Sequence, residues 1–297
     1  MREDDGSPCD GALVGLPFDA AIPTRPGARR GPDALRAALT RFAADQGEAQ
    51  WPAGARLTDL GDVDLARLTV AEAHDRIGSV LAGVLGRVVW LAAIGGDHSL
   101  TFPVFQALAA ARGGSWGLIA LDAHHDVRPY SRDSITSGTP FRRCLELGPG
   151  VLAPERLVQI GIRRYANIAG HRAWCEERGV AIYDVEAVRG RGWKMVADEA
   201  LTRAVGDADH LYVSLDLDVV DQAEAPGTSA AGPEGLAAAE ALSIVERLAG
   251  HPRFAAGDIM ELSPRWDPAG LTARLAARAL LAIVAARWPA AMTPIPA

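Results

Sequence analysis

The sequence predicts an α/β protein in which a doubly wound parallel β-sheet lies between two layers of helices, a three-layer αβα arrangement. Short apolar runs alternate with amphipathic helical stretches along the chain, and several runs are rich in β-branched residues. These runs lack alternation of apolar and polar residues, which is typical of strands buried on both faces. Strand–helix alternation at this spacing favours one such sheet. We expect a single domain over residues 1–297, with residues 1–10 and 289–297 loose.

The expected strands are the apolar runs between loops and helical stretches. They are Ala12–Phe18, Val88–Ile94, Trp116–Asp122, Leu157–Ile162, Val180–Tyr183, Leu211–Asp216 and Phe254–Glu261. The stretches between them have helical spacing of apolar residues. The expected helices are Pro32–Ala44, Val70–Leu85, Leu100–Ala111, Ile168–Glu177, Gly235–Leu248 and Gly270–Ala286. Binding sites in open parallel sheets form at the carboxyl ends of strands, so we expect the site among the polar residues that follow these runs.

Composition excludes several classes of function. The net charge of −7 and the pI of about 5.5 argue against a nucleic-acid partner, which needs clustered cationic charge. The three cysteines are too few and too scattered for a disulfide framework or a thiolate metal site, which favours a reducing compartment. Charged residues directly after Met1 and arginines within the apolar tracts indicate neither a secretion signal nor a membrane span. We therefore expect a cytoplasmic protein without a membrane partner.

Four segments rich in carboxylates and imidazoles follow apolar runs. They are Gly95–Ser99, Asp122–Asp126, Asp216–Asp218 and Asp258–Glu261. In an extended chain the side chains of Asp122, His124 and Asp126 point to one side, and a curved chain can also bring them together. A lone buried histidine or aspartate is usually a structural residue, but that explanation does not cover six such residues after strands. Burying four carboxylates without counter-charge costs on the order of several kcal/mol each, which two divalent cations would remove.

These motifs together resemble the arginase/agmatinase/formimidoylglutamase family, the ureohydrolases, over nearly the whole chain. The matching motifs are Gly95–Ser99 (GGDHS), Asp122–Asp126 (DAHHD), Ser214–Asp218 (SLDLD) and Asp258–Pro264 (DIMELSP). The resemblance implies the fold shared by arginases and deacetylases and a pair of Mn²⁺ ions per chain. It also implies a hydroxide that bridges the ions and attacks the amidine carbon of the substrate. Family members are commonly trimers or hexamers, so we expect a homo-oligomer.

The resemblance also assigns the metal ligands and the catalytic residues. One ion would be held by His98, Asp122, Asp126 and Asp216, and the other by His124, Asp122, Asp216 and Asp218. Asp122 and Asp216 would bridge both ions. Asp126 and Glu261 are the expected catalytic residues, and the Glu261 carboxylate would bind the cationic amidine or guanidine group of a small-molecule substrate.

Within the family, the chain is most similar to formimidoylglutamases, which convert formiminoglutamate and water into glutamate and formamide. They share the doubled histidine before Val127-Arg128 and a residue other than histidine before Gly138. Arginases and most agmatinases carry a histidine at the position of Ser137, which argues against those activities. We therefore expect Arg128, Ser137, Gly138 and Glu261 to contact the substrate.

Arg128 supports an anionic substrate tail, because a guanidinium binds a carboxylate bidentately and repels the ammonium of agmatine. The alternative is that Arg128 pairs with Asp133 or Glu146 at the surface. Other open alternatives are a guanidino-acid hydrolase or an agmatinase, both releasing urea. A zinc amidohydrolase of the deacetylase type and an inactive metal-binding relative also remain open.

Five further residues lie near the expected site or on a helix that follows it. Arg163 and Arg164 are additional candidates for contact with an anionic tail, because they follow an expected strand. We expect Arg142 and Arg143 to lie on a helix that begins near Thr139 and to form structural salt bridges. His125 is expected either to support the neighbouring ligands from behind or to have a packing role.

Overall fold

The computed structural model describes residues 1–22, 24–42 and 57–288. Its strands are β1 (Arg2–Glu3), β2 (Cys9–Leu16), β3 (Leu57–Asp62), β4 (Val88–Gly95), β5 (Trp116–Leu121), β6 (Leu157–Ile162), β7 (Ala181–Asp184), β8 (His210–Asp216) and β9 (Phe254–Met260). They form one sheet in the order β1-β3-β2-β4-β9-β8-β5-β6-β7. Every neighbouring pair is parallel. The predicted parallel sheet is therefore confirmed.

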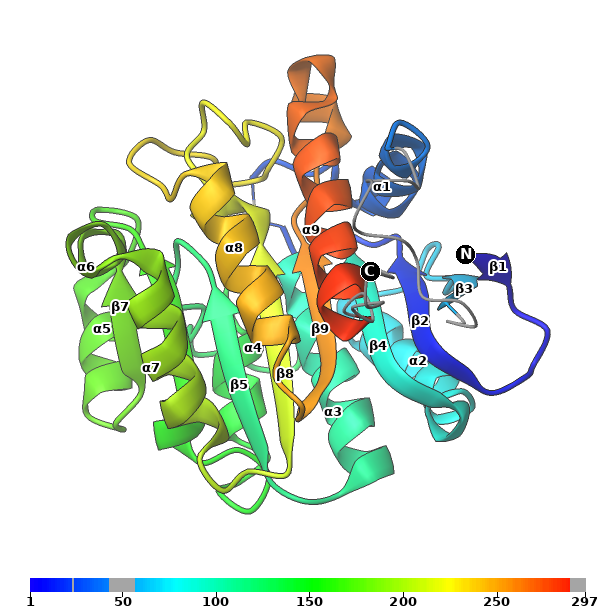
Figure 1. Ribbon diagram of the computed structural model, residues 1–297, viewed down its shortest axis with the longest axis horizontal. Coiled ribbons are helices and arrows are strands. Elements are labelled where there is room, and N and C mark those ends of the chain that lie inside the picture. The colour runs from blue at the N-terminus through cyan, green and yellow to red at the C-terminus, as the bar shows by residue number, and fades with distance from the viewer. Residues whose placement is uncertain (23, 43–56, 289–297) are drawn as a thin grey trace, which may run out of the picture.

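Helices cover both faces of the sheet (Figure 1). One face carries α1 (Gly31–Leu39), α6 (Val185–Arg191), α7 (Trp193–Val205), α8 (Ala238–Ala249) and α9 (Leu271–Arg287). The other carries α2 (Val70–Ala82), α3 (Thr101–Arg112), α4 (Pro140–Leu145) and α5 (Ala169–Glu176). The predicted three-layer, doubly wound arrangement is thus confirmed.

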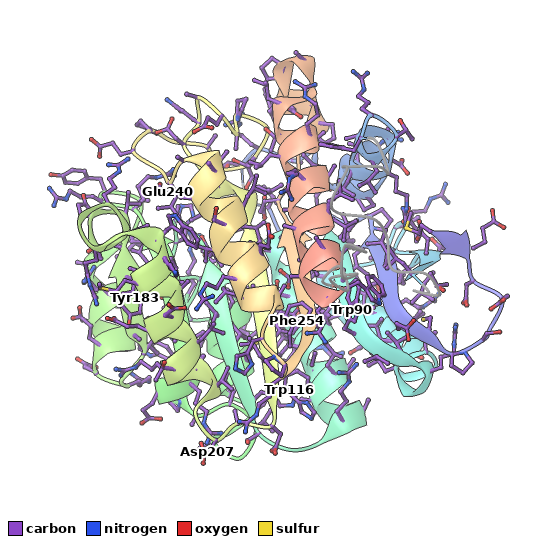
Figure 2. The ribbon with its side chains drawn as sticks, in the orientation of Figure 1. Trp90, Trp116, Tyr183, Asp207, Glu240 and Phe254 are labelled. Carbon is purple, nitrogen blue, oxygen red and sulfur yellow. The ribbon has the colours of Figure 1, made fainter. Side chains whose placement is uncertain are left out.

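The central strands contribute side chains to two hydrophobic cores, one on each face of the sheet. In β5, Ile119 and Leu121 face the core beneath α7, whereas Leu118 and Ala120 face the core beneath α3. Burial of one leucine or isoleucine side chain stabilises the fold by about 1.5–3 kcal/mol. Trp116 lies at the edge where its strand begins (Figure 2) and contacts the ring of Phe105, with 5.5 Å between the centroids. These two aromatic rings therefore fill the core at the amino end of β5.

Residues 1–10 are not loose as expected. Arg2–Glu3 pairs with β3, and Cys9 is a buried residue that begins β2. The expected loose segment 289–297 lies outside the described residues, as do the last residues of the helix expected to reach Ala44. That helix, α1, ends at Leu39.

Sequence patterning misses β1, β3, α6 and α7. β3 has the sequence LTDLGD, and only its first two residues are buried, so it lacks a long apolar run. α7 presents mainly alanines and valines to the core, and such small side chains give a weak periodic signal.

Among the described helices, the one that includes Pro268–Arg287 is long and apolar enough to cross a membrane by length and composition. More than half of its apolar window, 56%, is buried inside the protein. Its side chains belong to the core on one face of the sheet, and it packs against α1 and α8. The segment is therefore a core helix of this fold.

Candidate metal centre

The four polar segments meet at the carboxyl edge of the sheet, because β4, β9, β8 and β5 are consecutive neighbours in it. His98 begins a 3₁₀ turn after β4, and Asp122 follows β5. Asp216 ends β8, Asp218 lies in the next turn, and Glu261 follows β9. Parallel strands end at one edge of a sheet, which is why residues far apart in the sequence come together here.

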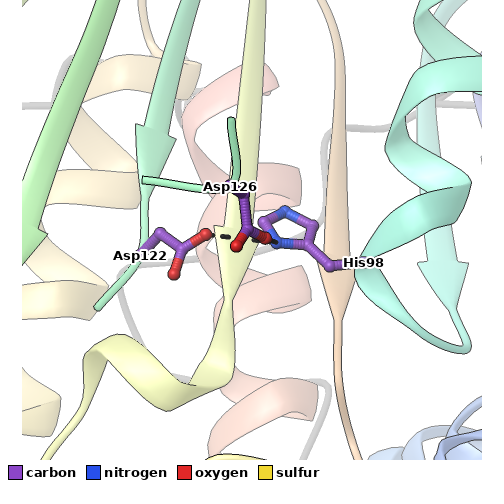
Figure 3. Close-up of side chains that lie close together, drawn as sticks. All are labelled: His98, Asp122 and Asp126. Carbon is purple, nitrogen blue, oxygen red and sulfur yellow. Dashed lines mark hydrogen bonds and ion pairs between the residues drawn. The ribbon is translucent and has the colours of Figure 1, made fainter. Parts of the chain in front are cut away.

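A first cluster surrounds the ring of His98. Its Nδ1 atom lies 3.0 Å from Oδ2 of Asp126 and 3.2 Å from Oδ2 of both Asp122 and Asp216. Figure 3 shows the Asp122 and Asp126 carboxylates beside this ring. The side chains of His98, Asp122 and Asp216 are buried. One nitrogen and three carboxylates therefore face a common point.

A second cluster lies on the other side of Asp122. Nδ1 of His124 is 3.0 Å from Oδ2 of Asp218 and 3.4 Å from Oδ1 of Asp122. Asp122 thus presents one oxygen to each cluster, as a bridging carboxylate would. Asp216 directs Oδ2 toward His98, while its Oδ1 accepts the Asp218 N–H at 2.8 Å. The bridging role of Asp216 stays a prediction.

The chain bends after β5 rather than continuing in an extended form, and the curved chain brings Asp122, His124 and Asp126 together. The His124 N–H donates to Oδ1 of Asp122 at 2.6 Å, which closes a tight turn. Asp126 and Glu261 have positive φ values of 48° and 67°, which residues other than glycine rarely adopt. Such backbones cost on the order of 1–3 kcal/mol each and cluster at functional sites.

A chain of hydrogen bonds supports His98 from behind. Its Nε2 lies 2.9 Å from Oγ of Ser214, which donates to Oδ1 of Asp258 at 2.7 Å. The Tyr212 hydroxyl donates to the other oxygen of Asp258 at 2.5 Å. Because Ser214 donates onward to Asp258, its oxygen accepts the proton of His98 Nε2. This tautomer leaves the lone pair of Nδ1 directed at the three carboxylates.

Electrostatics in the cluster favour added positive charge. Burial, and then the charge of Asp122, raise the pKa of Asp126 to about 6. Burial and the neighbouring Asp97 raise the pKa of Glu261 to about 8. Burial alone would lower the pKa of His124, but Asp218 and Asp122 raise it to about 12. When no metal ion is bound, these raised pKa values mean that the groups hold protons more tightly than they would in water.

The donor atoms fit a pair of divalent metal ions. Oδ2 of Asp122, which faces the His98 ring, is buried and forms no hydrogen bond. Carboxylate oxygens combined with imidazole nitrogens suit Mn²⁺ and, less selectively, Zn²⁺, Fe²⁺ and Co²⁺. The two groups of close donor atoms are His98–Asp122–Asp126 and Asp122–His124–Asp218.

The clusters form the floor of a cavity of about 280 Å³. Its lining includes Arg128, Ser137, Gly138 and Glu261, the four residues expected to contact the substrate. Sequence reasoning missed the remaining lining residues, which have no chemical signature in the sequence. They are Ile22, Thr24, Ser229 and Ala230.

Arg163 is not placed to contact a substrate tail, contrary to expectation. Its side chain is buried and donates to the carbonyl oxygens of Asp218 at 3.3 Å, Gly232 at 3.0 Å and Ala230 at 3.1 Å. It therefore ties the turn of a cluster aspartate to the loop that forms one cavity wall. Arg164 is exposed and lies 3.7 Å from Glu186.

Arg142 forms the expected ion pair with Glu146, at 3.3 Å on α4. Arg143 differs, because it donates to Nδ1 of His74 at 2.7 Å and stacks over the ring of Phe102. Of the two roles expected for His125, the structure supports packing. It is buried, and its Nδ1 lies 2.6 Å from Oε1 of Gln159.

Comparison with known proteins agrees with this geometry. The arginase family profile matches residues 9–285. A formimidoylglutamase from Halalkalibacterium halodurans is 36% identical over 281 residues, covering 93% of this chain and 87% of the relative.

Solved structures agree as well. The crystal structure of formimidoylglutamase from Bacillus subtilis has a TM-score of 0.90 and 31% identity, covering 99% of this chain and 91% of that one. Proclavaminate amidino hydrolase from Streptomyces clavuligerus has a TM-score of 0.86 and 32% identity, covering 97% and 95%. The chain therefore belongs to the arginase family and is a hydrolase of that family.

Proposed function

We propose that this protein is a formimidoylglutamase, which hydrolyses formiminoglutamate to glutamate and formamide with two Mn²⁺ ions bound. The observation that carries the proposal is the distribution of charge in one cavity. The floor is a cluster of carboxylates, whereas Arg128 is a cation in the lining of the same cavity. A substrate with a cationic amidine head and an anionic tail complements both ends.

Two ions would share the Asp122 carboxylate. His98, Asp122, Asp126 and Asp216 would hold one, and His124, Asp122, Asp216 and Asp218 the other. When bound, such an ion pair lowers the pKa of water toward neutrality and thereby supplies the nucleophile for hydrolysis. The carboxylates also keep the cavity floor electronegative, which favours a cationic substrate carbon nearby.

Glu261 is suited to hold the amidine head of the substrate. Its Oε1 accepts the His98 N–H at 2.9 Å, which fixes the carboxylate, while Oε2 is buried without a hydrogen bond. A bound cation would stabilise the charged carboxylate and lower its raised pKa. The carboxylate then orients the amidine carbon above the cavity floor.

Arg128 is suited to bind the substrate tail. In the described part of the chain, no carboxylate lies within ion-pair distance of its guanidinium, and Glu146 instead contacts Arg142 and the Tyr130 hydroxyl. Surface pairing of Arg128 with Asp133 or Glu146 is therefore not observed. Burial, and then the charge of Arg128, lower the pKa of the nearby His171. A substrate carboxylate would satisfy this free cation.

A guanidino-acid hydrolase is the second proposal, because an anionic tail beside Arg128 suits that substrate class as well. Agmatine fits less well, since its ammonium tail would meet the guanidinium. We further propose that the protein is cytoplasmic and acts as a homo-oligomer, a trimer or a hexamer, without nucleic-acid or membrane partners.

Metal stoichiometry tests the two-ion site. After loading with Mn²⁺ and desalting, the protein should retain two ions per chain, measured by elemental analysis. Asp218→Asn should reduce this to about one ion, because Asp218 faces only the second cluster, and Asp122→Asn should weaken both sites. The exposed Asp133→Asn is the matched control. One ion per chain in the wild type, unchanged by Asp218→Asn, would contradict the model of two sites.

Ser214→Ala tests the support behind His98. Loss of the hydroxyl frees the Nε2 proton of His98 from its acceptor, so Mn²⁺ affinity should fall about 10- to 100-fold, the usual effect of removing a partner of a metal-bound histidine. The affinity is measured by calorimetric titration of metal-free protein. Ser243→Ala, on the exposed side of α8, should leave the affinity unchanged. If Ser214→Ala binds Mn²⁺ as tightly as the wild type does, Ser214 does not support His98 as a metal ligand.

Glu261→Gln separates substrate binding from metal binding. The variant should keep both ions but lose activity on the order of 100-fold, as expected when one preorganised electrostatic partner is removed. Glu234→Gln is a control at another glutamate with positive φ. Loss of an ion in the Glu261 variant would instead make this carboxylate a metal ligand.

Substrate preference tests the proposed activity. The Mn²⁺-loaded enzyme should have its highest kcat/KM with formiminoglutamate, compared with guanidinobutyrate, agmatine and arginine. Arg128→Ala should lower that kcat/KM by about 10- to 100-fold, the scale for loss of a charged hydrogen-bond partner, and should preserve metal content. The control is Arg132→Ala, an exposed residue of the same loop.

Ser137→His alone should not create efficient agmatine cleavage, because Arg128 would still repel the ammonium. A wild-type preference for agmatine would overturn the anionic-tail proposal and leave only the family assignment.

A further inference from the structure

The side chain of Arg128 lies across the face of Gly138. If residue 138 had a Cβ atom, that atom would lie 2.7 Å from Cδ and Nε of Arg128 and 3.2 Å from Cζ. Carbon atoms do not approach this closely without a shift. Arg128 therefore has its present position only because residue 138 has no side chain.

The backbone of Gly138 does not itself require glycine. Its φ is not in the positive range that side chains disfavour, since Gly138 is absent from the described residues with positive φ. An alanine could adopt this backbone without strain. The clash of its methyl group would fall on the outer part of an exposed and flexible arginine side chain.

The main chain around this contact is held by several hydrogen bonds. The Arg128 N–H donates to the Gly138 carbonyl at 2.9 Å, and the Phe141 N–H donates to the Asp126 carbonyl at 3.2 Å. The Ser137 N–H donates to the Ala21 carbonyl at 3.0 Å. A methyl group at position 138 would consequently move the guanidinium rather than the loops.

We propose that Gly138 is a specificity-determining position, which acts by seating the Arg128 guanidinium at the cavity and not by touching the substrate. This inference rests on the proposed function, because it needs a substrate whose tail Arg128 binds. Gly138 is in this view a positioning residue, and its removal should resemble a partial loss of Arg128. A contact between Gly138 and the substrate itself would instead act whether or not Arg128 is present.

A double-mutant cycle distinguishes these possibilities. Gly138→Ala should lower kcat/KM for formiminoglutamate about ten-fold, mainly through KM, because a charged contact with the tail is displaced. Metal content and melting temperature should match the wild type. In an Arg128→Ala background, Gly138→Ala should have little further effect, since the group that it displaces is gone. Gly150→Ala is the matched control, because a Cβ there meets no neighbour.

Two results would overturn the seating role. One is an unchanged kcat/KM in Gly138→Ala, and the other is an equal loss in the presence and absence of Arg128. If Arg128→Ala turns over formiminoglutamate as the wild type does, the tail-binding role of Arg128 fails, and the seating role fails with it. If the wild type does not hydrolyse anionic-tail substrates, the proposed function fails instead. Crystal structures of the wild type and of Gly138→Ala show directly whether the Arg128 guanidinium moves. An unmoved guanidinium would also refute the positioning role of Gly138.

Discussion

The carboxylates that converge at one edge of the sheet are the constraint on which the rest of this structure depends. Asp122 and Asp218 are buried together with Asp216, whose pKa is raised well above its ordinary range by burial and by the charge of Asp218. Such a group is unstable as separate anions in a low-dielectric interior, and the compensating charge must come from protons or from cations. The two histidines that face these oxygens can compensate the charge as protonated rings, or lose that proton and serve as metal donors.

The parallel sheet makes this concentration of charge possible. Its central strands are buried on both faces, and this packing fixes the positions of their carboxyl ends. The polar residues come after these ends and therefore lie outside the two cores. Two of these residues, Asp126 and Glu261, have strained backbones. The strain is tolerated because strand pairing and hydrogen bonds such as His98 N–H to Glu261 determine the local path. Hydrophobic packing thus stabilises a site that would not form by itself.

Sequence could predict the sheet and the proximity of its polar segments, because both follow from apolar runs and from what comes after them. It could not predict Arg163, whose partners are backbone carbonyls and leave no mark in the sequence. The cavity wall at Ser229 and Ala230 was missed for a similar reason, since small residues in a loop have no distinct signal. β3 has no recognisable pattern because its last four residues, Asp59–Asp62, include two aspartates and a glycine and are not fully buried.

The two arginines near the cavity show why position alone does not reveal function. Arg163 and Arg128 both follow strands that end beside the site. Arg163 donates hydrogen bonds to three carbonyl oxygens, and it could bind a ligand only by losing these bonds, which hold the cavity wall. Arg128 is exposed, and its side chain has no carboxylate partner among the described residues. A cation whose hydrogen bonds are already satisfied gains little from a substrate carboxylate, whereas an unpaired cation gains most of the interaction. The polarity of the cavity, acidic at the floor and basic beside Gly138, therefore depends on one arginine being free and the other being occupied.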